Sequence, residues 1–470
     1  MGRRLKIGLG VGLVGVGIAA AALYRPLEVA ASYSAKRLCS EVFVAGRQEP
    51  SIVAEDLALM PVPLLTSVDR TARTASVNAL GVRRTAAWRP GLGCALAIGE
   101  SVEGLQALRA NPGPRPERGA GPWPEGEGPV DPSRVDPRID RQAMEAAVAA
   151  AFDEPDPDNL RRTRAVVVVY RGQLVAERYA EGFNKDTPLL GWSMTKSATN
   201  AVIGALVFQG RLDIHKPAPV PEWASDERAA ITTDMLLRMS SGLDFDEGYG
   251  PYGGATAMLF ARHDAAAEGA DHGLAHAPDE AWSYSSGTTN ILSRIARHTI
   301  GDDAVYLAYP RVAIFDPIGA TSAVMETDPS GTFVGSSFLY MTARDWARFG
   351  LLFARDGVWQ GRRLLPEGWA AAACTPTPKA PQGQYGAQWW TNAGDPPGSA
   401  NRPYPSLPVD TCSAQGFETQ RIMIIPSLDL IVVRLGLTRN SGDFDVDRFV
   451  AAIIGAIGPV PSEPESQKSR

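Results

Sequence analysis

The chain has 470 residues, of which 44% are hydrophobic, and this content is sufficient for a large packed core. Its net charge is −6 and no basic stripe runs along it, so nothing favours a nucleic-acid partner. No C-x-x-C spacing occurs and the five His residues form no recognisable ligand set, so we expect neither a metal nor another cofactor.

The N-terminal segment has the features of a membrane anchor. Basic residues near the start precede an uncharged run over residues 7–24. This run is longer than the core of most cleaved signals and near the lower limit for a membrane helix. We therefore expect residues 1–38 to be an anchor or signal, with the bulk of the chain exported to the periplasm or another extracytoplasmic space. A cleaved signal is the close alternative.

The cysteines fit an exported chain, because disulfides persist in oxidising compartments. Cys39 and Cys94 lie in the N-terminal region, and Cys374 and Cys412 lie near the C-terminal end. Four cysteines allow three pairings, of which Cys39–Cys94 with Cys374–Cys412 is the most economical. Free buried thiols are an almost equally good alternative.

Composition divides the remainder into an accessory region, a linker and a main domain. Residues 39–110 contain short β-compatible runs broken by Gly and Pro. Residues 111–138 are too rich in Pro and Gly for a regular element. The main domain follows over residues 139–458, and we expect the polar tail, residues 459–470, to be disordered.

The main domain is predicted to begin and end with strands. A helix over residues 141–152 precedes two strands within 163–180, and a helix-rich middle spans 193–300. A hairpin over 421–437 and an apolar helix over 444–457 close the domain. This order predicts a mixed α/β (α+β) fold: a mainly antiparallel sheet, split in the sequence and flanked by helices, with the helical insertion as a separate lobe.

Ser193 and Lys196 stand three residues apart at the start of a strongly apolar helix. Residues at i and i+3 share a helix face, so the amine can lie against the hydroxyl. A helix this apolar is buried, and burial favours the neutral, basic form of a lysine. The pair therefore suits a nucleophile and its base, with a helix N-terminus to favour negative charge. The alternative is an N-cap serine followed by a solvated lysine.

Two further stretches carry candidate site residues. Tyr284 stands in a short polar turn before another apolar helix; on its own it is better explained as a packed tyrosine. Gly416 stands at a strand and permits close backbone approach, so a neighbouring N–H could face a substrate carbonyl. A glycine that marks a β-bulge is the alternative there.

In this order, the three stretches resemble the serine β-lactamase and penicillin-binding-protein superfamily. The likeness is closest to its class C-like hydrolases, including the 6-aminohexanoate-dimer hydrolases and related esterases, and it covers roughly residues 139–458. It implies a β-lactamase/transpeptidase-like fold. The matching motifs are Ser193-Met194-Thr195-Lys196, Tyr284-Ser285-Ser286 and Ala414-Gln415-Gly416.

The resemblance implies a role for each matched position. Ser193 would form an acyl-enzyme, Lys196 would act as base or proton relay, and Tyr284 would shuttle protons to the leaving group and from water. The backbone N–H groups of Ser193 and Phe417 would form the oxyanion hole. Gly416 and Ser286 would then contact the substrate, a small ester or amide.

Two departures from the family pattern bear on the substrate. Ala414-Gln415-Gly416 lacks the lysine that normally places a cation near a substrate carboxylate, and Arg421 is only a speculative replacement. Ser286 stands where β-lactamases of the standard pattern have Asn, which removes an amide that could hold the substrate. Both losses argue against efficient β-lactam hydrolysis and leave ester or linear amide hydrolysis intact.

Other candidates carry less weight. Tyr249 could lie on a loop over the site, although an exposed loop aromatic is the simpler explanation. Trp389 could line the pocket, although a core position is more common for such a residue. Alternative functions are β-lactamase or D-alanyl peptidase activity and a non-catalytic binding protein on the same fold. An α/β-hydrolase is disfavoured because the last histidine is His298.

Overall fold

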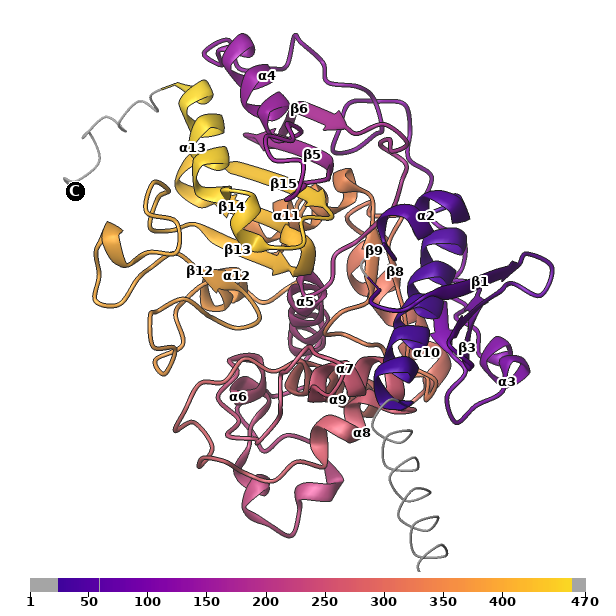
Figure 1. Ribbon diagram of the computed structural model, residues 1–470. Coiled ribbons are helices and arrows are strands. Elements are labelled where there is room, and N and C mark those ends of the chain that lie inside the picture. The colour runs from indigo at the N-terminus through magenta and orange to yellow at the C-terminus, as the bar shows by residue number, and fades with distance from the viewer. Residues whose placement is uncertain (1–23, 59, 459–470) are drawn as a thin grey trace, which may run out of the picture. The chain divides into compact units, whose positions relative to one another are not determined.

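The structure is a computed structural model that describes residues 24–58 and 60–458 (Figure 1). The described chain forms two compact units, each built from three stretches of sequence. Unit 1 contains the chain up to Pro112, Ile214–Ala308 and Val324–Phe338. Unit 2 contains Gly113–Asp213, Tyr309–Ala323 and the chain from Leu339 onward.

The membrane anchor predicted over residues 7–24 lies outside the described residues except at Tyr24. Within the described ranges, no helix combines the length and the apolar character needed to cross a bilayer. The predicted tail over residues 459–470 also lies outside the described residues.

Unit 2 contains a six-stranded antiparallel sheet whose strands come from both ends of the predicted main domain. The sheet order is β12-β13-β14-β15-β5-β6, so a C-terminal strand pairs with the first strand of the domain. The split antiparallel sheet is therefore confirmed. The strand bounds are β5 Thr163–Tyr170, β6 Gln173–Tyr179, β12 Trp390–Thr391, β13 Cys412–Gly416, β14 Gln420–Ile425 and β15 Leu430–Gly436.

Helices cover both faces of this sheet, which explains why β5 is buried along its whole length. Val166 and Val168 share one apolar cluster with the helices α4 (Arg141–Ala150) and α13 (Val446–Ile457), which lie side by side (Figure 1). Successive side chains of a strand point to opposite faces, so the alternate valines of β5 face the other side. There α11 (Ala343–Ala354) packs against β5, β14 and β15.

The remaining elements of unit 2 are short apart from one long helix. Helix α5 contains 15 residues and packs against β13 and β14. The bounds are β7 Leu189–Leu190, α5 Met194–Phe208, β9 Leu339–Met341, β10 Val358–Trp359, β11 Arg362–Arg363 and α12 Trp369–Ala373.

The Pro- and Gly-rich segment of residues 113–138 contains no helix or strand, as the sequence analysis expected, but it is fastened to unit 2. Arg348 donates from Nε to the Pro124 carbonyl at 2.9 Å and from Nη2 to the Gly126 carbonyl at 2.8 Å. The same guanidinium lies 5.5 Å from the ring centre of Trp123, which is buried. This segment therefore acts as a packed strap on α11.

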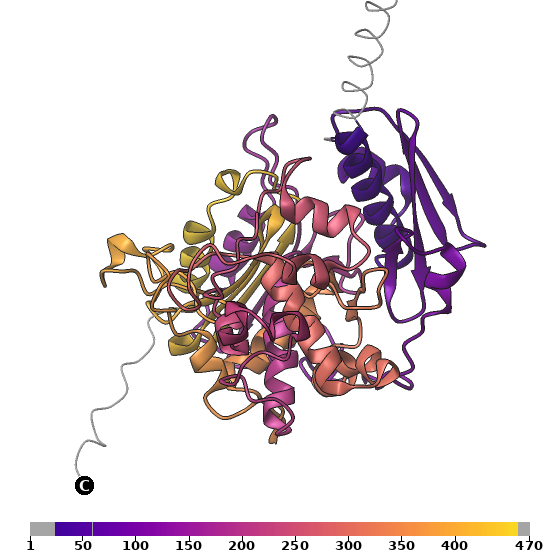
Figure 2. The same ribbon diagram turned by 90° about the horizontal axis from the view of Figure 1, so that it is seen from below.

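The N-terminal part of unit 1 is a helix against a four-stranded sheet, side by side in both ribbon views (Figure 2). The helix is described from residue 24 to residue 43, and therefore continues past residue 38, where the sequence analysis ended the leader. The predicted Cys39–Cys94 disulfide joins this helix to β4, and Cys374–Cys412 is formed as well. The bounds are α2 Glu49–Glu55, β1 Leu64–Asp69, β2 Thr74–Ala79, β3 Val82–Arg89, β4 Gly93–Leu96 and α3 Val102–Ala107.

A buried polar cluster connects this N-terminal part to the segment 324–338 of the same unit. The Lys36 ammonium pairs with the Glu326 carboxylate, which also accepts from Ser40 Oγ at 2.8 Å and from the Cys94 N–H at 2.6 Å. Burial lowers the pKa of Lys36, and the Glu326 charge opposes this. Removal of one partner would leave a buried charge uncompensated, so the N-terminal part is firmly integrated into unit 1.

The rest of unit 1 is the predicted helical lobe. Helix α8 packs closely on α9, where a Cβ on Gly269 would lie 2.8 Å from the Gly287 carbonyl oxygen. Helix α9 begins at the Ser285 cap, whose side chain accepts from the Thr288 N–H, and ends at the left-handed Gly301. The bounds are α6 Thr233–Leu237, α7 Gly254–Ala261, α8 Ala265–Ala270, α9 Ser286–Ile300, α10 Asp303–Pro310 and β8 Val324–Met325.

Candidate active site

Ser193 occupies the N-cap position of α5 but does not act as a side-chain cap. A capping serine accepts a hydrogen bond from a backbone N–H of the first helical turn, and the Ser193 side chain makes no such bond. The Lys196 ammonium nitrogen instead lies 3.3 Å from Ser193 Oγ, within hydrogen-bond distance. The structure thus brings the two residues together as the i, i+3 spacing predicts.

Lys196 is 1% exposed, although lysine is among the residues least often buried. It is buried because α5 runs through the interior of unit 2, with nearly every side chain covered. Gly204 of this helix is required by close packing, since a Cβ there would lie 2.7 Å from the Trp369 indole. The sequence prediction of a buried helix is confirmed.

The turn after β13 approaches the residues that precede Ser193. A Cβ on Gly416 would lie 2.1 Å from the Gly191 carbonyl oxygen, so only glycine fits this position. Phe417 follows with 52% of its surface exposed. The backbone N–H groups of Ser193 and Phe417 donate to no acceptor among the described residues. Both donors therefore remain available to a ligand.

Trp192 and Glu418 connect these two backbone segments, and the sequence analysis identified neither residue. Trp192 Nε1 donates to Glu418 Oε2 at 3.0 Å, and the Trp192 and Phe417 rings meet edge to face at 5.7 Å. Trp192 (φ 49°) and Glu418 (φ 61°) both adopt the left-handed conformation, which costs free energy in residues other than glycine. Such conformations persist where the surroundings impose them.

Arg434 stabilises the turn that contains Glu418 through hydrogen bonds to its backbone. This buried arginine donates from Nη1 to the carbonyl oxygens of Glu418 at 3.2 Å and Thr419 at 3.1 Å. Burial lowers the pKa of Arg434 to about 9. The remaining hydrogen bonds of Arg434 go to the Arg161 carbonyl and to the hydroxyl groups of Thr163 and Thr438.

The third motif provides no cation at the position of the missing lysine. Ala414 is buried in β13 and Gln415 Nε2 donates to Ser413 Oγ at 2.9 Å. Arg421 Nη1 donates to the carbonyl oxygens of Gly416 at 3.2 Å and Gln420 at 2.8 Å. The Arg421 guanidinium therefore stabilises the backbone of the turn between β13 and β14.

Tyr284, Ser286 and Tyr249 belong to unit 1 and are described within it. Tyr284 lies two residues before the first residue of α9, Ser286. Glu247 accepts from the Ser286 N–H and from Ser286 Oγ, both at 2.6 Å, and also from the Tyr249 hydroxyl. Tyr249 is 60% exposed. Glu247, not singled out from the sequence, thus organises the second motif and its neighbouring loop.

Trp389 is fully buried and packs between aromatic side chains of α11. Its ring stacks on Phe349 at 6.1 Å and lies 4.4 Å from Phe353. It is therefore a core residue of unit 2, the alternative that the sequence analysis gave for it.

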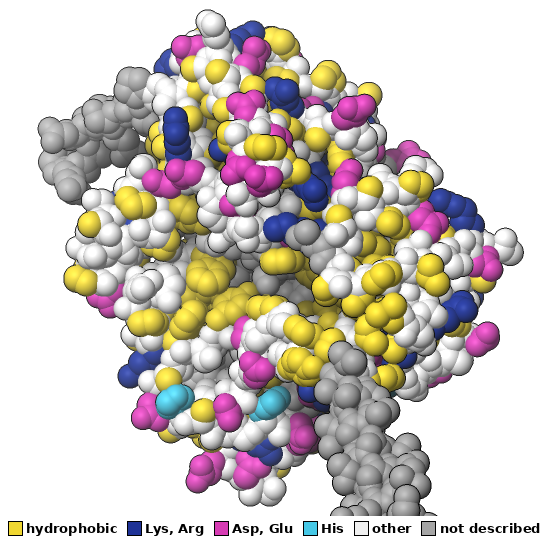
Figure 3. All heavy atoms as spheres, viewed as in Figure 1, with side chains coloured by type: hydrophobic (Ala, Val, Ile, Leu, Met, Phe, Trp, Pro, Cys, Tyr) yellow, Lys and Arg dark blue, Asp and Glu magenta, His cyan; other side chains and the backbone are white. Residues whose placement is uncertain are grey.

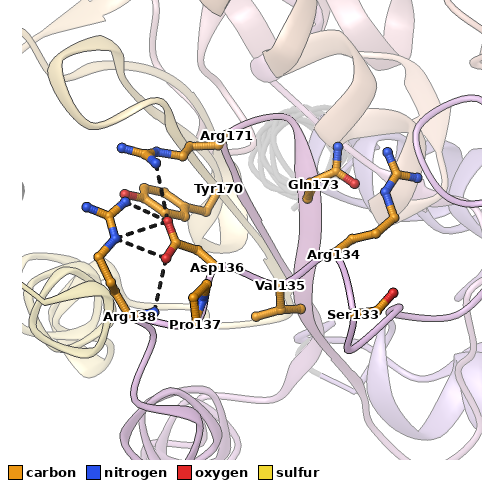
Figure 4. A pocket seen from close by; sticks show the side chains of 9 residues that line it. All are labelled: Ser133, Arg134, Val135, Asp136, Pro137, Arg138, Tyr170, Arg171 and Gln173. Atoms are coloured by element: carbon orange, nitrogen blue, oxygen red, sulfur yellow. Dashed lines mark hydrogen bonds and ion pairs between the residues drawn. The ribbon is translucent and has the colours of Figure 1, made fainter.

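A separate hollow of about 460 Å³ lies on the surface of unit 2 (Figure 4). It is lined by residues 133–138 with Tyr170, Arg171 and Gln173, and none of the predicted site residues is among them. Asp136 pairs there with Arg138 at 2.5 Å and Arg171 at 3.3 Å. Over the described residues, no group of three or more His, Cys, Asp or Glu side chains is placed to hold a metal ion.

A curated relative and several solved structures are similar to the chain. A 6-aminohexanoate-dimer hydrolase of Paenarthrobacter ureafaciens is 25% identical over 334 residues, which cover 64% of this chain and 80% of the relative. A penicillin-binding-protein homologue from Caulobacter crescentus has a TM-score of 0.51 at 18% identity, over 68% of this chain and 96% of its own. A family VIII carboxylesterase has a TM-score of 0.53 at 16% identity, over 68% and 97%.

These structural likenesses show the fold, which is that of β-lactamases and transpeptidases as the resemblance implied. The family model described as "Beta-lactamase" matches residues 142–456, more than half of the chain. The matched range contains the Ser193–Lys196 pair, the Tyr284 motif and the turn at Gly416. The chain therefore belongs to the beta-lactamase family, a family of hydrolases that share this fold.

Proposed function

We propose that the protein is a serine hydrolase that cleaves an ester or linear amide bond through an acyl-enzyme on Ser193. The observation that carries this proposal is the buried Lys196 amine 3.3 Å from a serine hydroxyl that caps no helix. Burial makes an ammonium costly, which favours a neutral amine able to accept the serine proton. A structural role for Ser193 would predict a capping hydrogen bond instead.

The first half of the reaction follows from these groups. Lys196 accepts the hydroxyl proton while Ser193 Oγ bonds to the substrate carbonyl carbon. The negative charge that develops on the carbonyl oxygen is stabilised by the N–H groups of Ser193 and Phe417 and by the N-terminus of α5. The bond to the leaving alcohol or amine then breaks as that group takes up a proton. By resemblance, Tyr284 delivers this proton.

The second half returns the enzyme to its starting state. A water molecule attacks the acyl carbonyl, and its proton passes to Tyr284, which gave up its own proton in the first half. The same N–H groups stabilise the second oxyanion, and the acid leaves as Ser193 Oγ regains a proton. Lys196 therefore takes the Ser193 proton in the first half and returns it in the second, and Tyr284 gives a proton to the leaving group and regains one from water.

The substrate class rests on what surrounds the third motif. Ala414 is buried and apolar where the family pattern has a lysine, and Nη1 of Arg421 is engaged with backbone oxygens, so the third motif itself offers no cation to a substrate carboxylate. This disfavours β-lactams and D-alanyl peptides, both of which carry one. The named curated relative, a 6-aminohexanoate-dimer hydrolase, supports a linear amide or ester.

We also propose that the hydrolase works outside the cytoplasm, tethered to the membrane by residues 7–24. Support comes from the uncharged run with its basic flank and from the two disulfides, which persist in oxidising compartments.

The test combines labelling with turnover. A fluorophosphonate probe should label Ser193 in the wild type, and a panel of p-nitrophenyl esters, short linear amides and nitrocefin should show turnover of the first two. Ser193→Ala should abolish both signals while the protein stays folded.

Ser101→Ala is the matched control, because Ser101 is a true N-cap that accepts from the Gly104 N–H at 3.0 Å. It should lower stability by about 1 kcal/mol and leave turnover unchanged. A folded Ser193→Ala variant with wild-type turnover would reject the proposal at this serine. No labelling and no turnover in the wild type would favour a binding protein on the same fold.

A further inference from the structure

Unit 1 exposes large apolar side chains around the point where the described chain begins. Tyr24, the first described residue, is 48% exposed, Leu80 in the β2–β3 turn is 64% exposed, and Tyr252 is 58% exposed. Figure 3 shows hydrophobic side chains gathered on this part of the surface. Isolated exposed apolar residues are ordinary, but a contiguous group marks an interaction surface.

A loop with no charged residue adds to this group. The chain between Asp56 and β1 is uncharged and reads Leu-Ala-Leu-Met-Pro-Val-Pro. Met60 and Val62 of this loop are half-buried against Ala79 and the first turns of the N-terminal helix. We define the apolar collar as Tyr24, Leu27, Met60, Val62, Leu80 and Tyr252.

Arginines lie among the collar residues. The Arg25 guanidinium lies 6.0 Å from the ring centre of Tyr252 and donates to the Tyr252 carbonyl at 3.3 Å. Arg84 pairs with Glu28 and donates to the Tyr24 hydroxyl at 3.1 Å. These contacts place Tyr252 beside the first turn of the N-terminal helix and Tyr24 beside β3, so segments far apart in sequence lie together at this end of unit 1.

We propose that the apolar collar lies against the phospholipid bilayer in which residues 7–24 are anchored. The uncharged run of the sequence ends at Tyr24, which is itself a collar residue. Because the collar therefore begins where the proposed anchor ends, the bilayer is the nearest surface for it to contact. Tyrosines with one apolar and one polar end are favoured at the membrane–water interface, and arginines can place their stems in the apolar layer and their charge among the phosphates.

This inference identifies the surface of unit 1 that faces the lipid. The N-terminal helix and its four-stranded sheet would then lie at the membrane surface. The inference depends on the anchor and not on the hydrolytic reaction. The two proposals can therefore fail separately.

The test uses the full chain reconstituted in vesicles of phosphatidylethanolamine and phosphatidylglycerol. The photoreactive residue p-benzoylphenylalanine is placed at Leu80 and, in a second protein, at Tyr252. The control position is Thr71, in the exposed turn at the opposite end of the β1–β2 hairpin. The six residues of β1 separate that turn from the collar by roughly 17 Å.

Irradiation followed by mass spectrometry should show lipid adducts at Leu80 and Tyr252 and at least tenfold less at Thr71. Circular dichroism confirms that each protein is folded. Equal adduct yields at all three positions, no adducts at the collar, or failure of the full chain to associate with vesicles would each overturn the proposal. Covalent protein dimers at the collar positions would also overturn it, in favour of a surface between two copies of the chain.

Discussion

The Trp192 indole donates a hydrogen bond of 3.0 Å to the Glu418 carboxylate, and this bond joins the residue before Ser193 to the residue after Phe417. This side-chain contact therefore links the two backbone segments whose N–H groups are proposed as the oxyanion hole. Both partners occupy left-handed conformations that the backbone would otherwise avoid. The contact fixes the relative position of two donors that must reach the same oxygen atom.

Removing this contact should impair turnover without removing any reacting group. We expect Glu418→Ala to lower kcat for a p-nitrophenyl ester about 10²-fold with little change in KM, because a misplaced oxyanion donor acts on the transition state. Glu418→Gln still offers an oxygen to Trp192 Nε1 and should recover most of the loss. A parallel rise in KM, or equal effects of the two variants, would mean that Glu418 supports the fold only.

The Ser193–Lys196 pair should behave as one unit. Lys196→Ala leaves the hydroxyl without its base, so turnover should fall by about 10²-fold or more, the scale of one lost acid–base partner. The double variant Ser193→Ala/Lys196→Ala should then be hardly worse than Ser193→Ala alone, because residues that act together are not additive. Additive losses in kcat/KM would contradict a shared proton transfer.

Tyr284→Phe removes one hydroxyl and keeps the ring. If Tyr284 shuttles protons, turnover should fall about 10²-fold and the loss should be smaller for substrates with better leaving groups, which need less protonation. Tyr309→Phe is the matched control, since it removes a hydroxyl that donates to Gln209 Oε1 at 3.0 Å. Equal small effects of both substitutions would assign Tyr284 a packing role.

Periodicity and element order were sufficient to predict the split sheet and the buried helix α5, and closeness in sequence favoured the observed cysteine pairing but left free thiols as an alternative. Each depends on local patterns: the valine run of β5, the apolar run after Ser193, and cysteines that are near in sequence. The Ser193–Lys196 contact follows from helix geometry alone.

The supporting residues could not be predicted because their roles come from contacts between distant segments. Glu418 reaches Trp192 across 226 positions, and Lys36 reaches Glu326 across 290. A tryptophan or glutamate with a left-handed backbone conformation cannot be recognised in a sequence, because glycine is the residue that usually indicates such a conformation. The sequence offered one indication of their importance: Trp192 and Glu418 are each next to a residue proposed as an oxyanion donor.

The Cys374–Cys412 disulfide should stabilise the strand that carries the third motif. Cys412 begins β13 and Gly416 ends it, and the bond closes a separation of 38 residues. Loop-closure entropy predicts a loss of about 4 kcal/mol in the free energy of unfolding for Cys374→Ser/Cys412→Ser. Denaturant titration of the oxidised wild type and the variant measures this loss. Identical midpoints would show that packing alone holds β13.

Asp328 should make the stability of unit 1 depend on pH in the acidic range. Its carboxylate is buried and accepts from the Ala265 N–H at 2.9 Å, Ser330 Oγ at 2.6 Å and the Thr332 N–H at 3.1 Å. Burial raises the pKa of Asp328 to about 6 from the ordinary 3.8, although these hydrogen bonds oppose the shift.

Between pH 4 and pH 6 the folded state therefore binds more protons at Asp328 than the unfolded state does, and stability must fall as pH rises through this window. Asp328→Asn mimics the protonated carboxyl and removes the dependence. Relative to the wild type, the variant should gain up to about 3 kcal/mol in the free energy of unfolding between pH 4 and pH 7. Denaturant titrations at each pH measure the difference, in which the other titrating groups cancel. Parallel stability curves for the two proteins would show that Asp328 keeps an ordinary pKa in the folded state.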